Sequence, residues 1–352
     1  MAYFDPEPKR RREDFFDMEL EMEELRRGLR VSKLVAVLGL RRYGKTSLIL
    51  TTLNELGLDY VFIDCRLLPS GMLSMSDILA LFEKELSRKS WFRAVAESIE
   101  GIEVGPLGVR FRRRDINTLV SALERLEGKI LVLDEVQELR RCRYRFDSLI
   151  AYLYDHVDLR IIVSGSQIGM VHRFLRLEDP SAPLYGRPIH VVRLRPLDRE
   201  RAREFLLKGF AQEGMEPPHD LIERALDMLD GVIGWLTYFG YSYTRLGVRD
   251  LDRIIDMASR LALEELHHAL QIYGIARPRY AAALKAVAIL GEASWSEIMR
   301  FIESKLGKIP RNTLSNILKN LVDMSILTKT PSGYRIADPI LAHAVRKYLE
   351  IA

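Results

Sequence analysis

The stretch "VAVLGLRRYGKTSLIL", Val35–Leu50, places glycines and cations between two apolar segments. Its centre, Gly39–Thr46, has the spacing G-x-x-x-x-G-K-T. The apolar run before it predicts a buried strand, Leu34–Leu38, and the run after it predicts a helix. Glycines let the backbone curl so that its N–H groups point inward, and the helix N-terminus adds positive potential. The stretch therefore predicts a phosphate-binding loop, with a chance match in a tight turn as the alternative.

Individual residues of this loop have expected roles. Lys45 is expected to reach the β- and γ-phosphates of ATP, and Thr46 to offer its hydroxyl to Mg²⁺. The other positions are expected to surround the phosphates. The predicted nucleotide-binding residues are Gly39, Leu40, Arg41, Arg42, Tyr43, Gly44, Lys45, Thr46 and Ser47.

A second apolar run ends in two adjacent acids. "KILVLDEV", Lys129–Val136, is apolar on both faces, as a strand covered on both sides must be. Buried carboxylates are costly unless they are paired, so acids here suggest a function. We expect Asp134 to hold the Mg²⁺ shell and Glu135 to orient and deprotonate the attacking water. The alternative places both acids at a solvated strand end.

Polar residues also follow a third apolar run, "IIVSGSQIG". Ser164 and Ser166 lie where ligands bind in sheets of this kind and are expected to sense the γ-phosphate; a serine-capped helix start is the alternative. Arg187, in the loop "SAPLYGRPIH", is expected to reach a γ-phosphate in its own site or in a neighbour's. A surface salt bridge is the alternative for Arg187.

Strand-like and helix-like segments alternate over the first two hundred residues. The predicted strands are Leu34–Leu38, Tyr60–Arg66, Lys129–Val136, Leu159–Ser166 and His190–Leu197. The predicted helices cover about 16–29, 76–99, 115–127 and 145–157, and Gly101–Arg114 predicts a hairpin. This alternation predicts an α/β fold with a mainly parallel, doubly wound sheet.

The pattern changes after Pro196 and again near Ala276. Residues 198–275 are almost wholly helix-like. The remainder predicts three helices and two short strands around Pro331–Gly333, the order of a winged helix. We therefore predict a core domain over 1–196, a helical domain over 197–275 and a winged-helix domain over 276–352.

The predicted winged helix is basic. From Arg277 onward there are twelve Lys and Arg against six Asp and Glu, whereas the whole chain has a net charge of +4. In a DNA-binding winged helix the third helix enters the major groove, and cations contact phosphates. The nucleic-acid candidates are Arg311, Asn312, Lys319, Lys329 and Arg335. A structural or protein-contact role is the alternative.

The composition excludes several classes of protein. A chain of 352 residues exceeds one ordinary core, and 48% hydrophobic with 29% charged residues is typical of globular proteins. The apolar runs are too short to span a bilayer, and two cysteines cannot build a disulfide framework. The amino terminus has no signal-peptide pattern. We therefore expect a cytoplasmic protein with no membrane partner.

Several motifs together resemble a known family. In order they are "GLRRYGKTSL", "VFIDCR", "LVLDEVQEL", "VSGSQIGMV", "PLYGR", "LRPL", "GWLTYFG" and "GYRIADPIL". Their order and spacing resemble the archaeal ATPase family of P-loop proteins, which is related to the STAND and AAA+ NTPases and to the origin-recognition ATPases. The resemblance covers essentially the whole chain. It implies an ATP-binding core with Walker A and Walker B motifs, a helical lid and a C-terminal winged helix.

Two details of the resemblance concern single residues. Arg41 and Arg42 match the family's double-arginine loop, and they are expected to face phosphate, a neighbouring subunit or solvent. Gly234-Trp235 stands where related proteins often have a glycine–proline motif that contacts nucleotide. Because the proline is missing, that contact is open, and a place in the core is the alternative for Trp235.

We expect an ATP- and Mg²⁺-dependent hydrolase whose turnover drives a switch between core, lid and winged helix. A nucleotide-gated DNA-binding or scaffold protein with little turnover is the alternative. A small-molecule kinase ranks last, because kinases share the loop but rarely carry an Asp-Glu pair and a winged helix. If Arg187 acts on a neighbouring site, the protein must form an oligomer.

Overall fold

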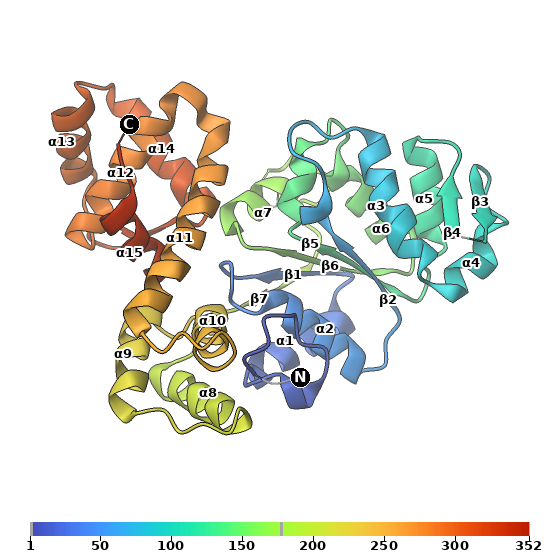
Figure 1. Cartoon of the computed structure of the whole chain (residues 1–352). Coiled ribbons are helices and arrows are strands. Elements are labelled where there is room, and N and C mark those ends of the chain that lie inside the picture. The colour runs from blue at the N-terminus through green and yellow to red at the C-terminus, as the bar shows by residue number, and fades with distance from the viewer. Residues whose placement is uncertain (1–2, 107, 177–178, 352) are drawn as a thin grey trace. The chain divides into compact units, whose positions relative to one another are not determined.

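The computed structural model describes residues 3–106, 108–176 and 179–351 (Figure 1). Within these ranges no helix combines the length and the apolar character that a bilayer span requires. The described chain forms two compact units, which differ in their secondary structure and are taken in turn below.

The two units interleave along the sequence. The sheet unit comprises Pro8–Gly39 and Lys45–Leu194. The helical unit comprises Met1–Glu7, Leu40–Gly44 and Arg195–Ala352. The middle of the phosphate loop therefore packs with the helical unit, while both ends of the loop belong to the sheet unit.

The sheet unit is built on a five-stranded parallel sheet with the strand order β2-β5-β6-β1-β7. The strands are β1 (Leu34–Leu38), β2 (Tyr60–Asp64), β5 (Ile130–Asp134), β6 (Arg160–Gly165) and β7 (Ile189–Arg193). All residues of β1 and β5 are buried, which explains their unbroken apolar runs. The predicted parallel α/β core is confirmed.

Helices cover both faces of this sheet. Figure 1 shows α1 and α2 on one face and α3, α5 and α6 on the other. The helices are α1 (Glu19–Val31), α2 (Lys45–Glu55), α3 (Met75–Ser87), α4 (Ser90–Ala96), α5 (Ile116–Glu124), α6 (Phe146–His156) and α7 (Ile168–Leu175). Short 3₁₀ turns cover Arg12–Asp14, Cys65–Leu67 and Val136–Arg141.

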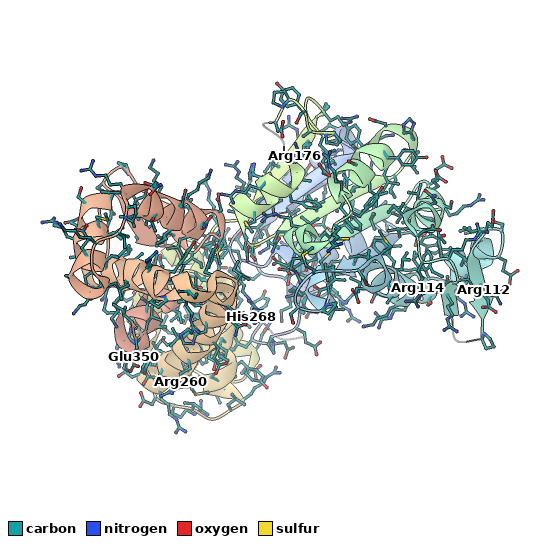
Figure 2. The ribbon with its side chains drawn as sticks, turned by 90° about the horizontal axis from the view of Figure 1, so that it is seen from above. Arg112, Arg114, Arg176, Arg260, His268 and Glu350 are labelled. Carbon is teal, nitrogen blue, oxygen red and sulfur yellow. The ribbon has the colours of Figure 1, made fainter. Side chains whose placement is uncertain are left out.

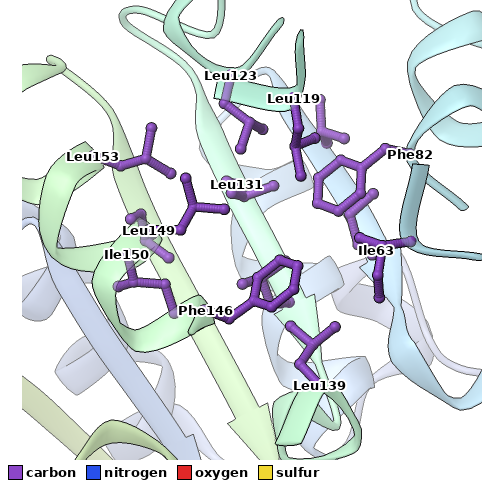
Figure 3. Packing of buried hydrophobic residues seen from close by; sticks show 14 of the residues in the cluster. Ile63, Phe82, Leu119, Leu123, Leu131, Leu139, Phe146, Leu149, Ile150 and Leu153 are labelled. Atoms are coloured by element: carbon purple, nitrogen blue, oxygen red, sulfur yellow. The ribbon is translucent and has the colours of Figure 1, made fainter. Parts of the chain in front are cut away.

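The main core lies between β2, β5 and the helices α3, α5 and α6. Figure 3 shows Phe82 of α3 and Leu119 of α5 against Ile63 and Leu131 of the sheet, with Leu149 of α6 beside them. All five side chains are buried. Burial of these apolar side chains stabilises the unit, by about 25 cal/mol for each Å² of apolar surface removed from water.

The predicted helix over 76–99 breaks in two. Ser87 ends α3, and its hydroxyl accepts the Val109 N–H at 2.8 Å and donates to the Val109 carbonyl at 3.2 Å. These bonds tie the break to the predicted hairpin, whose antiparallel strands are β3 (Ile102–Gly105) and β4 (Gly108–Phe111). A side chain that bonds to a distant backbone competes with continuation of the helix.

In the helical unit, residues 198–275 form four helices, in agreement with the helix-like sequence of this segment. They are α8 (Arg199–Gln212), α9 (His219–Leu229), α10 (Ile233–Thr244) and α11 (Leu251–Leu270), followed by a 3₁₀ turn at Gln271–Ala276. Phe4 inserts between α8 and α10 and is fully buried. A Cβ at Gly209 or at Gly240 would lie 2.3 Å from its ring, so only glycine leaves room for Phe4.

The rest of the helical unit has the predicted winged-helix order. Its elements are α12 (Arg277–Leu290), α13 (Trp295–Leu306), α14 (Arg311–Asp323), β8 (Leu327–Lys329), β9 (Tyr334–Ile336) and α15 (Pro339–Tyr348). A bridge between Ala293 and Tyr334 extends the β8–β9 hairpin. The helix α15 is not among the sequence predictions. It begins at Pro339, and Asp338 caps it by accepting the N–H groups of Ile340 and Leu341.

Candidate active site

The candidate site lies at one edge of the parallel sheet. The phosphate loop follows the carboxyl end of β1, Asp134 ends β5, and Ser164 is the residue before the last one of β6. Val37 of β1 pairs with Ser164 in register, and Asp64 at the end of β2 pairs with Asp134. Because parallel strands end at the same edge, four chain segments bring polar groups together there.

The loop has the backbone that a phosphate site requires. Gly44 has φ +83°, a left-handed conformation that glycine adopts without strain, and α2 begins at the next residue. The ammonium group of Lys45 donates to the Gly39 carbonyl at 2.9 Å and is almost fully buried. A buried cation at a helix N-terminus makes this loop an anion site.

Asp134 lies beside Thr46. The Thr46 hydroxyl donates to Asp134 Oδ2 at 2.9 Å, and Ser164 donates to Asp134 Oδ1. Burial raises the pKa of the Asp134 carboxyl, and the charge of Glu135 adds to that, although the hydroxyls oppose it. A carboxylate and a hydroxyl side by side are the hard oxygen ligands that Mg²⁺ prefers.

Glu135 is held from several sides. It adopts a left-handed backbone conformation, with φ 52°. Ser166 donates to Glu135 Oε2 through its N–H at 3.0 Å and its hydroxyl at 2.7 Å, and Lys45 Nζ lies 3.8 Å from Oε1. Burial raises the pKa of the Glu135 carboxyl, but Lys45, Gln137 and Ser166 outweigh it, so the pKa lies below its ordinary value. The two adjacent acids are thus shifted in opposite directions.

Gln137 is a site residue that sequence reasoning missed. Its Nε2 donates to Glu135 Oε2 at 2.6 Å, and the side chain is buried. Its Oε1 is buried without a hydrogen-bond partner among the described residues. A Cβ at Gly165 would lie 2.5 Å from this oxygen, so the glycine makes room for it. The only sequence signal was a polar residue two positions after Glu135.

Arg66 is a second missed residue. It follows β2 and binds Asp64 through two N–H groups, at 2.9 and 2.7 Å. Its Nη2 also lies 3.9 Å from Asp134 Oδ2. A half-exposed cation therefore stands at the same edge of the sheet as the two acids.

Arg187 does not join this group. Its guanidinium binds Asp155 through two N–H groups, at 2.9 and 2.6 Å. Asp155 lies near the end of α6, before β6, and Arg187 precedes β7, so both lie at the amino edge of the sheet. The phosphate loop lies at the carboxyl edge, about 15 Å away for five-residue strands. This placement argues against a role for Arg187 in its own chain's site, and the predicted surface salt bridge is present.

The two loop arginines contact the helical unit. Arg42 Nη1 and Nη2 bind Glu265 of α11 at 3.0 and 2.6 Å, and Arg41 lies 3.3 Å from the same carboxylate. The Arg42 guanidinium stacks on Trp235, whose side chain is 1% exposed. This contact with a carboxylate of the same chain was not among the roles left open for the two arginines, which were phosphate, a neighbouring subunit or solvent. Trp235 is a buried core aromatic.

The nucleic-acid candidates are all exposed but do not form one patch. Arg311, Asn312 and Lys319 lie on the exposed face of α14, whose other face buries Leu314 and Leu318. On the wing, Arg335 pairs with Thr328, one residue before Lys329. Because neighbouring residues of a strand point to opposite faces, Lys329 and Arg335 lie on different faces of the hairpin.

Two basic runs in the sheet unit are partly neutralised. Arg112 pairs with Glu103 and Arg113 with Glu100, on and beside the β3–β4 hairpin. Figure 2 shows Arg112 and Arg114 beside this hairpin. In the other run, Arg141 pairs with Glu138 and Arg145 with Asp147. We therefore interpret these two runs mainly as surface arginines that form ion pairs with neighbouring acids.

Two family models match parts of this chain. Residues 15–239 match the family model of an ATPase domain found predominantly in Archaea. Residues 274–337 match the model of the C-terminal winged helix-turn-helix domain of MCM proteins. No curated protein matches the sequence significantly.

One solved structure agrees with the family match. The Walker-type ATPase PABY2304 of Pyrococcus abyssi is 33% identical, with 98% of this chain and 99% of that chain covered and a TM-score of 0.82. The RuvB Holliday junction branch migration motor of Thermotoga maritima is 14% identical over 97% of this chain and 98% of that one, with a TM-score of 0.45. The likeness to PABY2304 extends over sheet, helical and winged-helix segments alike.

Proposed function

This chain belongs to the archaeal ATPase family of P-loop proteins, and on that premise we propose that it hydrolyses ATP with Mg²⁺ to drive a conformational switch that its winged helix passes to DNA. Nucleotide binding and hydrolysis follow from the family. The catalytic residues, the metal and the coupling to DNA are the proposal.

The environment of Glu135 carries the proposal. Its lowered pKa keeps it ionised at neutral pH, as a group that orients and deprotonates water must be. The partnerless Oε1 of Gln137 can accept a hydrogen bond from a water beside Glu135. Ser166, already bonded to Glu135, can exchange that bond for one to the γ-phosphate and so report its presence. The Glu135 carboxylate would therefore serve both the activation of water and, through Ser166, the detection of the γ-phosphate.

Asp134 and Thr46 fit a magnesium ion. When bound there, Mg²⁺ would neutralise charge that develops on the phosphate oxygens. Among the described residues no group of three or more His, Cys, Asp or Glu is arranged to hold a metal ion. We propose that phosphate oxygens of the nucleotide would complete the ligands of the ion. Because burial already disfavours the Asp134 carboxylate, a nearby cation would stabilise it strongly.

The winged helix supports DNA as the partner through the exposed cations of α14. A phosphate backbone is contacted by Lys and Arg, and the helix supplies Arg311 and Lys319 on one face. A protein partner is the other reading of this domain. Replacing both cations by neutral residues distinguishes a DNA partner from a protein partner, because the affinity for DNA depends on phosphate contacts and on salt concentration.

The decisive measurement is ATP turnover of the wild type and of Glu135→Gln, each with and without duplex DNA. We expect Glu135→Gln to lower kcat by about 10²- to 10⁴-fold while ATP remains bound. Glu138→Gln is the matched control, since Glu138 is an acid of the same segment whose partner is the surface residue Arg141. Equal turnover of Glu135→Gln and wild type would refute the catalytic assignment.

DNA binding is measured separately, as affinity against salt concentration. We expect the double substitution Arg311→Gln and Lys319→Gln to weaken binding and to reduce the salt slope by about two. Arg203→Gln, at α8, is the control. If the wild type binds no duplex at low salt, the DNA assignment fails and the ATPase assignment stands.

A further inference from the structure

Arg42 lies at the middle of the phosphate loop, yet its contacts are with the helical unit. Both terminal nitrogens bind the Glu265 carboxylate, and the Arg42 Cζ lies 3.9 Å from the centre of the Trp235 ring. The side chain is only 19% exposed. A two-pronged ion pair with a stacked aromatic is a specific, low-freedom arrangement, unlike the mobile surface pairs of most arginines.

The backbone of Arg42 is held as well. Its φ of 68° is left-handed, which is uncommon for a residue with a β-carbon. Its carbonyl accepts the N–H of Gly234 at 2.9 Å. A Cβ at Gly234 would lie 2.5 Å from the Arg42 Cβ, so glycine is needed for this approach. Arg42 thus joins the middle of the phosphate loop to both α10 and α11.

The contact continues to the winged helix. The indole N–H of Trp235 lies 3.0 Å from both oxygens of Asp338. The same carboxylate accepts the N–H groups of Ile340 and Leu341 and so caps α15. Burial raises the pKa of Asp338, with the two backbone amides and the indole opposing it. The cap therefore depends on the donor that Trp235 supplies.

We propose that Arg42 is a positioning residue that couples nucleotide binding at the phosphate loop to the capping of α15 in the winged helix, through Trp235 and Asp338. The inference rests on the proposed function in that the loop must bind ATP–Mg²⁺. Coupling of this kind is reciprocal: whatever stabilises the capped α15 tightens nucleotide binding, and nucleotide stabilises the cap. It gives the double arginine a role away from the phosphates.

The test compares nucleotide affinity with hydrogen exchange in α15. Dissociation constants for ATP–Mg²⁺ are measured by calorimetry, and exchange of the Ile340 and Leu341 amides is measured with and without ATP–Mg²⁺. In the wild type we expect nucleotide to slow this exchange. In Arg42→Ala we expect affinity to fall by about 5- to 150-fold, the usual range of coupling between sites, and the exchange response to vanish at saturating nucleotide.

Four further variants, one of them a control, test which residues carry the coupling. Glu265→Ala should repeat the effect of Arg42→Ala, and the double variant should lose little more, because the residues act as a pair. Trp235→Phe keeps a ring for Arg42 but lacks the indole N–H that reaches Asp338. The α15 response should therefore be lost and, because the coupling is reciprocal, affinity for ATP–Mg²⁺ should fall as it does in Arg42→Ala. Arg203→Ala is the control, since Arg203 binds Glu223 by two N–H groups at 2.7 and 3.0 Å within the same unit.

The outcomes distinguish the two proposals. If Arg42→Ala binds ATP–Mg²⁺ with wild-type affinity and keeps the α15 response, the coupling is overturned and the ATPase function stands. If Arg203→Ala loses affinity and response as Arg42→Ala does, the effect is a general loss of stability and the coupling is again overturned. If the wild type binds no nucleotide, both proposals fail.

Discussion

Replacement of Asp134 by Asn should make the ligand-free protein more stable while removing its magnesium-dependent activity. Asn has nearly the same shape, so the substitution exchanges a buried charge for a neutral amide. Burial is the main cause of the raised Asp134 pKa. A raised pKa means that the folded chain holds the proton more tightly than the unfolded chain, so the ionised form lowers the free energy of unfolding.

The magnitude follows from opposing contributions. Burying the carboxylate costs several kcal/mol, and the hydroxyls of Thr46 and Ser164 return about 1.5–3 kcal/mol each. The Asn oxygen keeps one of these bonds, and its amino group can donate to the other hydroxyl, at about 1 kcal/mol each. We expect a net gain of about 0.5–2 kcal/mol at pH 7, a size common for substitutions that relieve a functional site.

The assay is urea unfolding followed by circular dichroism, without Mg²⁺ or nucleotide, over a range of pH. The wild type recovers stability as pH falls through the raised pKa toward the ordinary value near 3.8, so the gap between the proteins should narrow in acid. Asp155→Asn is the control of opposite sign, because its bond to Arg187 lowers the pKa of Asp155. A variant less stable than wild type at pH 7, or one that retains Mg²⁺-dependent turnover, would refute the reasoning.

Other substitutions test single contacts. Phe4→Ala should cost about 3–5 kcal/mol in urea unfolding, because the ring is fully buried; a loss below about 1 kcal/mol would mean that this segment is not held. Gly231→Ala should destabilise the protein far more than Gly247→Ala. Both glycines have positive φ, but a Cβ at Gly231 would lie 2.0 Å from the Leu197 carbonyl oxygen, whereas a Cβ at Gly247 would have no described atom within 4 Å. Thermal unfolding of the two variants compares them directly, and equal losses would contradict the steric argument. Arg187→Ala should leave turnover per chain unchanged at concentrations where the protein is monomeric; a loss that appears only with oligomer formation would indicate action on a neighbour's site.

The sheet and the acidic site were predictable because their signals are local. A run such as "KILVLDEV" carries its own burial pattern, and the phosphate loop shows its glycines and its lysine at fixed spacing. Parallel order then brings strand ends to one edge whatever lies between them. The contact of Thr46 with Asp134 is a consequence of that order.

The missed features depend on contacts between distant residues. Gln137 matters because its amide reaches Glu135, and Arg42 because Glu265 lies 223 positions later. Arg187 looked suitable by its place in a loop, but only the topology shows that this loop lies at the far edge of the sheet. By contrast, the helix α15 has a local start signal, Asp338 followed by Pro339, which the sequence prediction overlooked.

The interleaving of the two units sets an order of events during synthesis. Residues 40–44 are made early, but Trp235 and Glu265, which contact Arg42, are made much later, Glu265 by 223 positions. A nascent chain that has reached Leu194 therefore already has its acidic pair and its lysine, yet the middle of its loop has nothing to pack against. We expect such a chain to bind nucleotide poorly, so that tight nucleotide binding arises only after α10 and α11 have been translated.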